Sequence, residues 1–313
     1  MPRRILVFGS LNMDLIMPAE RVPRPGETLA CGDFVAAPGG KGANQACAAG
    51  RLGKHVIMVG RVGADSFGPK LIESLAAAGV ETSEVKTVDG STGAAFILVL
   101  PDGENLILLS LGANARFEVE PDLLERLSLN SGDCVLAQLE SPIETVNAAL
   151  AAGRKAGATT ILDPAPARAL PPELLGNVDW LTPNQTEAAI LLGDPGLEID
   201  DYASAETAAH RLLALGPKGV IMKLGALGCL AVTTQAVLSQ SAFPVRAVDT
   251  TAAGDAFNGA FAVALVEGRD LPSALRFGCA AAGISVTRMG AQPSMPTRDE
   301  ADRFLVSAEA ACS

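Results

Sequence analysis

Short apolar segments that end in glycine alternate with helix-like segments along most of this chain of 313 residues. Residues 4–9 (RILVFG) form a continuous apolar run, as a strand buried on both faces requires. Paired glycines open the helix-like segment 39–53, residues 55–60 return to an apolar run, and residues 65–79 have helical apolar spacing. The alternation predicts an α/β domain with a doubly wound, mostly parallel sheet covered by helices on both faces.

The second half of the chain keeps this order of elements. Further strands are expected at 134–138, 159–163, 178–181 and 219–224, and further helices at about 142–157, 184–192, 204–215, 254–267 and 272–288. No internal repeat, low-complexity tract or linker interrupts the pattern. The sequence therefore predicts one main domain over residues 1–313.

One region departs from the alternation. Residues 94–100 and 105–111 are strand-like runs joined across a Pro-Asp-Gly turn, and residues 27–35 offer a third short strand. These runs lie in inserted segments at about 14–38 and 92–112 and predict a small separate sheet. Such a sheet is either a lid over a pocket or a plain surface hairpin.

Composition narrows the classes of function. The net charge is −11 and no cluster of Lys and Arg occurs, which argues against a nucleic-acid partner. No run reaches eighteen apolar residues and no targeting segment is recognisable, so we expect a cytoplasmic protein without a membrane partner. Six widely spaced cysteines without a CxxC pair are typical of reduced thiols, and the two histidines leave a carboxylate as the expected general base.

The segment 248–257 (VDTTAAGDAF) leads small residues and a glycine directly into a predicted helix. Free backbone N–H groups at such a helix start form an anion site. Asp255 either complements the helix dipole, worth a few tenths to about 1 kcal/mol, or takes a proton from an attacking hydroxyl while the amides hold a transferring phosphoryl group. Spacing alone slightly favours the first interpretation.

A second glycine-rich helix start lies at residues 38–45 (PGGKGANQ). It is not a phosphate-binding P-loop, because Gly42 stands where Ser or Thr is required, and it does not match the dinucleotide fingerprint. Glycines let the backbone approach a polyol closely while Lys41 and Asn44 donate to its hydroxyls. A tight loop with a solvated lysine is the alternative.

Two other segments place polar side chains directly after strands. Asn12 and Asp14 follow the first strand, where ligands of open α/β sheets bind, although such residues are also common after strands in general. Asn184 and Glu187 stand three residues apart at a helix start. They either form an ordinary helix cap or lie near Mg²⁺ and its waters.

Taken together, these segments resemble the ribokinase-like (phosphofructokinase-B) carbohydrate kinase family from about Ile5 to Pro296. The resemblance rests on several segments in this order: GSLNMD (9–14), PGGKGANQA (38–46), STGAAFILV (91–99), GENLILLSLGANA (103–115), QLESP (138–142), DPAPA (163–167), TPNQTEA (182–188), LGALG (224–228), VDTTAAGDAFNGAF (248–261) and VTRMGAQPSMP (286–296). Each segment is modest evidence, whereas their combination is specific.

The resemblance implies an ATP-dependent kinase that phosphorylates D-ribose at O5, with Mg²⁺ as cofactor and K⁺ as activator. It implies that Asp255 is the catalytic base and that Ala252, Ala253 and Gly254 form the anion hole. The implied sugar-binding residues are Asn12, Asp14, Gly40, Lys41, Asn44, Glu140 and Asp255. The implied nucleotide-binding residues are Asn184, Lys223, Gly225, Gly228, Gly254 and Cys279, with Glu187 near Mg²⁺.

The resemblance further implies a monovalent-cation site, formed mostly by backbone carbonyls, at Asp249, Thr251, Ser285, Arg288, Gly290 and Ser294. It also implies a homodimer that pairs through the small sheet. Two positions depart from the family pattern: Lys223 stands where Thr is familiar, and Cys279 stands where His or Asn is familiar. Neither departure touches Asp255 or the sugar-binding segments.

Alternatives remain within and beyond this class. The alternative substrates are deoxyribose, fructose or a nucleoside such as adenosine, although Asn12 and Asp14 favour a vicinal diol. A non-catalytic sugar-binding protein on the same fold is a second alternative. A nicotinamide-dependent dehydrogenase is a poor third, since the turn after the first strand lacks the required glycines.

Overall fold

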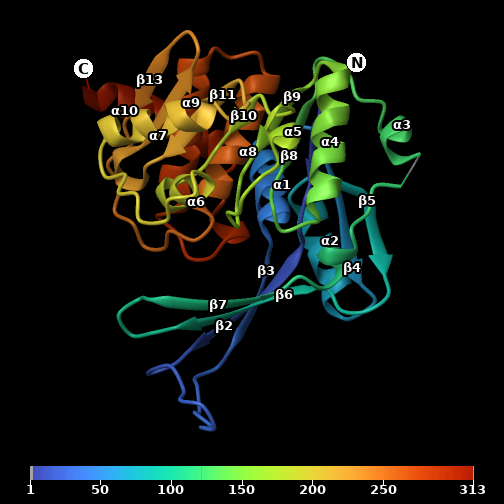
Figure 1. Cartoon of the computed structure of the whole chain (residues 1–313). Coiled ribbons are helices and arrows are strands. Elements are labelled where there is room, and N and C mark those ends of the chain that lie inside the picture. Colours follow the sequence, from blue (N-terminus) through green and yellow to red (C-terminus); the bar gives the residue numbers. More distant parts are fainter. Residues whose placement is uncertain (1–2, 121, 313) are drawn as a thin grey trace.

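The computed structural model describes residues 3–120 and 122–312 (Figure 1). In this part of the chain the main sheet has nine strands in the order β13-β12-β11-β10-β9-β8-β1-β4-β5. The strands from β5 to β11 in this order are parallel, and β12 and β13 add an antiparallel edge. Their bounds are β1 Ile5–Phe8, β4 Val56–Gly63, β5 Val80–Val88, β8 Cys134–Ala137, β9 Thr159–Leu162, β10 Trp180–Leu181, β11 Gly219–Lys223, β12 Cys229–Thr233 and β13 Val237–Gln240.

Helices cover both faces of this sheet because its strands are apolar on both sides. In β1, Ile5 and Val7 pack into one hydrophobic cluster, whereas Leu6 and Phe8 pack into the other. The first cluster is covered by α1 Lys41–Arg51, α2 Phe67–Ala77, α8 Ala253–Val266, α9 Leu271–Ser285 and α10 Arg298–Cys312. The second is covered by α3 Leu123–Leu127, α4 Ile143–Ala156, α5 Pro172–Leu175, α6 Gln185–Leu191 and α7 Tyr202–Leu213. The predicted doubly wound, mostly parallel α/β fold is confirmed.

A second, four-stranded sheet projects from the main body in the order β3-β2-β6-β7 (Figure 1). Its strands are β2 Asn12–Pro18, β3 Val35–Gly39, β6 Gly93–Val99 and β7 Asn105–Ser110. The predicted hairpin of β6 and β7 is present, with Gly103 at φ 87° in its turn. The small sheet is therefore built from two separate insertions into the alternating pattern.

The strand predicted at 27–35 is wrong, because only Val35 belongs to β3. The Glu27 side chain accepts hydrogen bonds from the Arg24 amide and from Arg21, which folds this segment into a turn. The strand that pairs with β6 in the small sheet, in parallel, is instead β2.

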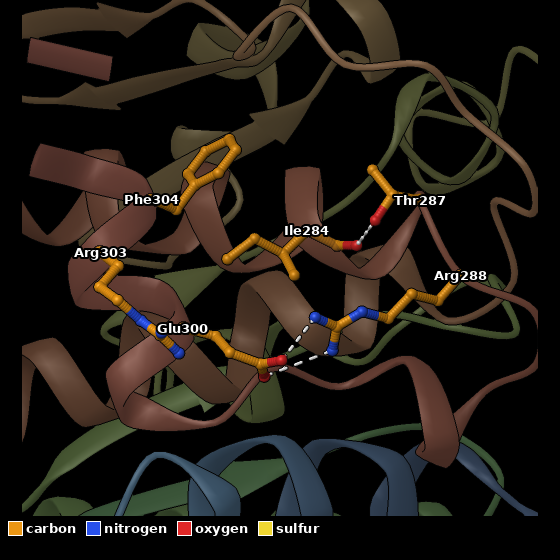
Figure 2. A pocket seen from close by; sticks show the side chains of 6 residues that line it. All are labelled: Ile284, Thr287, Arg288, Glu300, Arg303 and Phe304. Atoms are coloured by element: carbon orange, nitrogen blue, oxygen red, sulfur yellow. Dashed lines mark hydrogen bonds and ion pairs between the residues drawn. The ribbon is translucent and has the colours of Figure 1, made fainter. Parts of the chain in front are cut away.

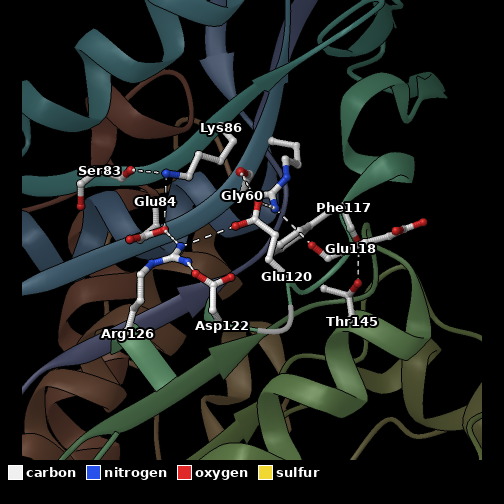
Figure 3. A network of polar contacts seen from close by, with 11 residues as sticks. Gly60, Ser83, Glu84, Lys86, Phe117, Glu118, Glu120, Asp122, Arg126 and Thr145 are labelled. Atoms are coloured by element: carbon white, nitrogen blue, oxygen red, sulfur yellow. Dashed lines mark hydrogen bonds and ion pairs between the residues drawn. The ribbon is translucent and has the colours of Figure 1, made fainter. Parts of the chain in front are cut away.

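A polar network fixes the chain where it returns from the small sheet to the main sheet (Figure 3). The buried Arg61 of β4 donates to the Glu118 carbonyl and pairs with Glu120 at 3.1 Å. Its guanidinium lies 4.8 Å from the centre of the Phe117 ring. Arg126 of α3 adds ion pairs to Glu84 of β5 and to Glu120. This network holds the end of the second insertion against the main domain.

None of the helices in the described ranges combines the length and apolarity that crossing a bilayer requires.

Candidate active site

Polar side chains converge where the parallel strands of the main sheet end. Ser10 follows β1, Gln138 and Glu140 follow β8, Asp163 follows β9, and Lys223 ends β11. All of these residues are joined through hydrogen bonds to the start of α1 or to one another. The carboxyl ends of strands are where open α/β sheets bind ligands.

Asp255 lies in the first turn of α8 and is only 6% exposed. Its two carboxylate oxygens accept hydrogen bonds from Asn44 Nδ2 at 3.0 Å and from Gln45 Nε2 at 2.9 Å. Burial raises the pKa of Asp255 to about 6, against the opposing attraction of the Lys41 ammonium. A carboxylate with a pKa near neutrality is well matched to accept a proton at physiological pH.

Glu140 organises a second part of the site. Its Oε2 atom accepts hydrogen bonds from Ser10 Oγ, from Asn12 Nδ2 at 3.2 Å and from the Lys41 amide at 3.1 Å. Gly40, with φ 90°, lets the start of α1 approach this closely, because a Cβ atom there would lie 2.6 Å from the Asn12 backbone nitrogen. Glu140 thus fixes the ends of β1 and β2 against the start of α1.

Asp14 and Lys41 face the same site from the small sheet and from α1. Burial raises the pKa of Asp14 to about 7, with further repulsion from Glu140 and Asp255. Burial disfavours the charge of Lys41, but Asp255, Asp163 and Glu140 outweigh it and raise the pKa of Lys41. The charges of Glu140 and Asp255 are therefore close enough to Asp14 and Lys41 to shift the pKa values of both residues.

A hydrogen-bonded chain links the Lys223 side to Asp255. Lys223 Nζ lies 2.8 Å from Asp163 Oδ1, and Gln45 Nε2 donates to Asp163 Oδ2 at 2.8 Å as well as to Asp255. Gln138 Nε2 donates to Gln45 Oε1 at 2.7 Å and so fixes the orientation of that amide. Gln45 therefore holds two buried carboxylates with one amino group.

Sequence reasoning assigned no role to Gln45, Gln138, Asp163, Ser10 or Asn114. All five stand within segments that carry the family resemblance, and Gln138 and Asp163 directly follow buried strands. For Gln138 and Asp163, the position directly after a strand was the signal that could have indicated a role in the site. The buried Asn114, from the 3₁₀ turn after β7, donates to Asn12 Oδ1 at 2.7 Å. Asn114 thereby orients Asn12, one of the predicted sugar-binding residues.

A cavity of about 510 Å³ opens beside the start of α8. It lies among the turn after β11, the segment before α8 and helix α9. Five of the six predicted nucleotide-binding residues line it, namely Lys223, Gly225, Gly228, Gly254 and Cys279, whereas Asn184 is not part of its wall. Ala253, Phe257, Phe243 and Val245 are among its other walls. Ala252, at φ 59°, turns the chain into α8 so that Ala253 and Gly254 face this space. The first-turn amides of a helix lack intrahelical acceptors and suit an anion.

Asn184 and Glu187 form a capping box at the start of α6. Asn184 Oδ1 accepts from the Glu187 amide at 2.8 Å, and Glu187 Oε2 accepts from the Asn184 amide at 2.7 Å. Burial raises the pKa of Glu187, with Lys223 opposing and Asp163 reinforcing this shift. The cap is therefore real, and it also places the Glu187 carboxylate within electrostatic reach of the Lys223–Asp163 pair.

The residues expected at a monovalent-cation site come from two neighbouring loops. Asp249 joins the loops by accepting from the Thr251 amide at 2.9 Å and from the Gly290 amide at 2.8 Å. The hydroxyls of the buried Ser285 and Ser294 donate to backbone carbonyls. No group of three or more His, Cys, Asp or Glu side chains suited to a metal ion occurs within residues 3–120 and 122–312.

The side chain of Arg288 does not join the other residues expected at the cation site. It forms a two-pronged ion pair with Glu300 of α10, in the wall of a smaller cavity of about 310 Å³ (Figure 2). Ile284, Thr287, Arg303 and Phe304 complete that wall. Only the backbone of Arg288 is thus left for the expected cation site.

The buried Asp255 carboxylate thus lies at the start of a helix, between a cluster of polar side chains and a cavity, an arrangement that suits a phosphotransferase of the α/β class. The chain belongs to the pfkB family of carbohydrate kinases, whose family model matches residues 2–298. The expected family is confirmed, and with it an ATP-dependent sugar kinase.

Named relatives span nearly the whole chain. Ribokinase of Haemophilus influenzae is 42% identical over 306 residues, which cover 97% of this chain and 99% of the relative. Deoxyribokinase of Salmonella typhimurium is 38% identical over 305 residues, covering 96% and 98%. The solved structure of Arabidopsis thaliana ribokinase complexed with ribose and ATP is 36% identical, with a TM-score of 0.89 and coverage of 97% and 98%.

Proposed function

We propose that the protein transfers the γ-phosphoryl group of ATP to O5 of D-ribose. The observation that carries this proposal is Asp255, a buried carboxylate held by Asn44 and Gln45 at the start of α8, where that helix lines the large cavity. The ribokinase relatives and the solved ribokinase structure with ribose and ATP support the choice of substrates.

In this proposal the sugar lies among Asn12, Asp14, Lys41, Asn44 and Glu140, with Gly40 permitting close backbone approach. The carboxylate of Asp14 accepts hydrogen bonds from two neighbouring hydroxyls, and the side chains of Lys41 and Asn44 donate to others. Asn44 Oδ1 is buried and has no hydrogen-bond partner among the described residues, so it is an available acceptor for a sugar hydroxyl. This arrangement directs the terminal CH₂OH toward Asp255.

Asp255 accepts the proton of the O5 hydroxyl as the oxygen attacks phosphorus. The Asn44 and Gln45 side chains keep the carboxylate in place, and the ionised form predominates above its pKa of about 6. The amide of Gly254, which the turn at Ala252 orients, stabilises the charge of the phosphoryl oxygens, and the Ala253 amide joins it once it releases the Thr250 carbonyl, to which it donates at 3.2 Å. Exclusion of water by a closing lid prevents wasteful hydrolysis of ATP.

The nucleotide occupies the 510 Å³ cavity in this proposal, with its base near Cys279 and its phosphates toward Gly254. A Cβ atom on Gly254 would lie 3.3 Å from Lys223 Nζ, so the ammonium stands beside the proposed anion hole. Lysine at position 223 therefore adds positive charge where threonine would add a hydroxyl. Gly225 and Gly228 keep the turn after β11 low enough for a nucleotide to lie against it.

Two cations complete the proposed chemistry. We propose that Glu187, together with Asp163, whose charge helps to raise the pKa of Glu187, would hold Mg²⁺ through its waters, since this ion keeps part of its hydration shell. Mg²⁺ supplies positive charge to the phosphates. The carbonyls of Asp249, Thr251, Ser285, Arg288, Gly290 and Ser294 are the proposed K⁺ ligands, on loops that the Asp249 side chain joins.

We also propose a cytoplasmic location. It is supported by the free thiols at Cys31, Cys47, Cys134, Cys229 and Cys279.

The test is a panel of sugars with MgATP, in the presence and absence of K⁺, read as sugar-dependent ADP release. Ribose should give the highest kcat/KM, and K⁺ should increase it. A higher value for 2-deoxyribose would move the assignment to the activity named for the Salmonella relative. No ADP release with any pentose, hexose or nucleoside would favour a sugar-binding protein and overturn the proposed reaction.

We further propose one main domain over residues 1–313, with the small sheet as a lid that pairs with a second copy of the chain. Edge strand β7 exposes apolar side chains along its length, with Ile107 59% and Leu108 75% exposed, and Phe34 is 63% exposed next to β3. Such a surface on an edge strand is prone to association. A twofold contact would cover the same strand in both copies.

Replacing Leu108 by aspartate should weaken the dimer by at least about 100-fold, since each copy loses a buried leucine and two charges meet at the contact. Sedimentation velocity at micromolar concentration measures the effect. Val306→Asp is the matched control, because this valine is also exposed (67%) but lies on α10, away from the small sheet. A wild-type protein that sediments as a monomer at this concentration would contradict the dimer.

A further inference from the structure

Two buried thiols meet in the wall of the large cavity. Cys229 is the first residue of β12, directly after Gly228, and Cys279 lies in the middle of α9. Their Sγ atoms are 3.6 Å apart, although the residues are 50 positions apart in the sequence. Cys229 is 1% exposed and Cys279 is 7% exposed, and Cys279 also lines the cavity. A small reagent that enters the cavity therefore meets a thiol with a second thiol in contact behind it.

We propose that Cys229 and Cys279 form a reversible disulfide upon oxidation by hydrogen peroxide, and that this disulfide and a bound nucleotide disfavour each other. The inference rests on the proposed function, because it takes the cavity as the nucleotide site. Formation of the disulfide itself does not depend on that assignment.

The geometry requires only a small movement to make the bond. A disulfide has an S–S length of 2.05 Å, so the sulfur atoms must approach by about 1.5 Å from their separation of 3.6 Å. The β12 side of the pair is tightly packed, because a Cβ atom on Gly228 would lie 2.1 Å from the Gln240 carbonyl oxygen. The approach therefore has to come mainly from Cys279 and α9.

Movement of α9 changes the shape of the cavity. Gly278 packs against the Phe257 ring so closely that a Cβ atom there would lie 2.8 Å from two ring carbons. Phe257 lines the cavity together with Ala282, Gly283 and Val286 of the α9 region. A shift of Cys279 toward β12 thus displaces several wall residues at once, and close-packed walls do not absorb such a shift freely.

The chemistry balances with hydrogen peroxide as the oxidant. The Cys279 thiolate attacks one peroxide oxygen, the O–O bond breaks, and the leaving hydroxide becomes water with the thiol proton, which leaves a sulfenic acid. Cys229 sulfur then attacks the Cys279 sulfur, the S–S bond forms, the S–O bond breaks, and a second water carries away the Cys229 proton. Two thiols lose two electrons in total, and one hydrogen peroxide gains them as it becomes two waters.

Contact with Cys279, together with burial, raises the pKa of Cys229 well above its usual value. Because thiolates are the reacting species, oxidation should be slow at neutral pH and faster at pH 8 to 9. A bound nucleotide covers Cys279 and fixes the cavity wall. By linkage, the factor by which the disulfide weakens nucleotide binding equals the factor by which nucleotide disfavours the disulfide.

The experiment uses the full chain with Cys31→Ser, which removes an exposed cysteine as a source of intermolecular disulfides. The protein is treated with hydrogen peroxide at pH 8, with and without a saturating non-hydrolysable ATP analogue. Peptide mass mapping should find a 229–279 disulfide, and calorimetry should show nucleotide affinity reduced by at least about tenfold and restored by dithiothreitol. In a redox buffer of reduced and oxidised dithiothreitol, the analogue should shift the equilibrium from the disulfide toward the thiols by the same factor.

Cys279→Ser and Cys229→Ala are tested in parallel, so that the test does not depend on the folding of a single variant. Cys279→Ser should have the same nucleotide affinity before and after peroxide treatment, and dithiothreitol should not change it. Cys229→Ala, which keeps Cys279, should form no disulfide. Absence of the 229–279 disulfide from oxidised protein, or its presence with unchanged nucleotide affinity, would overturn the inference. If the reduced protein binds no nucleotide but the disulfide forms, the proposed function fails and the thiol chemistry stands.

Discussion

Asp255→Asn should lower kcat by at least about two orders of magnitude, because a positioned general base contributes roughly 10²–10⁴-fold. The amide has nearly the shape of the carboxylate: its oxygen still accepts from Gln45, and its NH2 group donates to Asn44 Oδ1 once the Asn44 amide turns over. It does not accept the O5 proton at neutral pH. Ribose binding should remain close to that of the wild-type protein, so the loss should be seen in kcat and not in the ribose dissociation constant. Steady-state kinetics with MgATP and calorimetric titration with ribose measure the two quantities.

The pH profile provides a second readout of the same group. Since the pKa of Asp255 is raised to about 6, the wild-type kcat should fall as the pH drops below about 6, where the base becomes protonated. Asp255→Asn should lack this acidic limb. Asp194→Asn, at an exposed position after α6, is the matched control and should retain both rate and profile. Turnover within a few-fold of wild type in the Asp255 variant would rule out its role as base.

The main sheet was predictable because its strands are short, apolar and followed by glycine or a helix start. Ile5–Phe8 and Cys134–Ala137 are fully buried, and an uninterrupted apolar run is the pattern of a strand with helices on both faces. Strand β2 was not predicted, since Asn12 and Asp14 alternate with apolar residues where a loop after β1 was expected. The antiparallel edge of β12 and β13 also escaped prediction.

The candidate site was predictable as a set of helix starts and strand ends, but not as a network. Spacing within 38–45 and 248–257 indicated two anion- or polyol-binding helix starts, and the structure brings Asn44 and Asp255 within hydrogen-bonding distance. The role of Gln45 depends on packing between α1, α8 and the end of β9, because Gln45 is 118 positions from Asp163 and 210 positions from Asp255 in the sequence. Local sequence contains no signal for such a contact.

The Gln45 contacts also indicate why Lys223 is tolerated in this chain. Lys223 neutralises Asp163, and Asp163 in turn shares the Gln45 amino group with Asp255. Burying one more positive charge near the proposed anion hole is favourable only if a carboxylate accompanies it. The pair therefore keeps an ammonium beside Gly254 without leaving an uncompensated charge in the interior.

Asp14→Ala should reduce kcat/KM for ribose by about 100-fold, mainly through a higher ribose KM. Two sugar hydroxyls lose a charged acceptor, and each hydrogen bond to a charged group contributes about 1.5–3 kcal/mol. A combined loss of about 3 kcal/mol lowers kcat/KM by roughly 100-fold. The KM for ATP should change little, because Asp14 lies on β2 and does not line the large cavity. Initial rates with each substrate varied separately measure this split.

The same residue should make ribose binding depend on pH. Burial raises the pKa of Asp14 to about 7, and only the ionised carboxylate accepts from two hydroxyls. The wild-type ribose KM should therefore decrease as the pH rises from 6 to 8, whereas the KM of Asp14→Ala should stay flat. Asp33→Ala, an exposed aspartate just before β3, controls for loss of charge near the small sheet. An Asp14→Ala protein with a wild-type ribose KM across this pH range would place the sugar elsewhere.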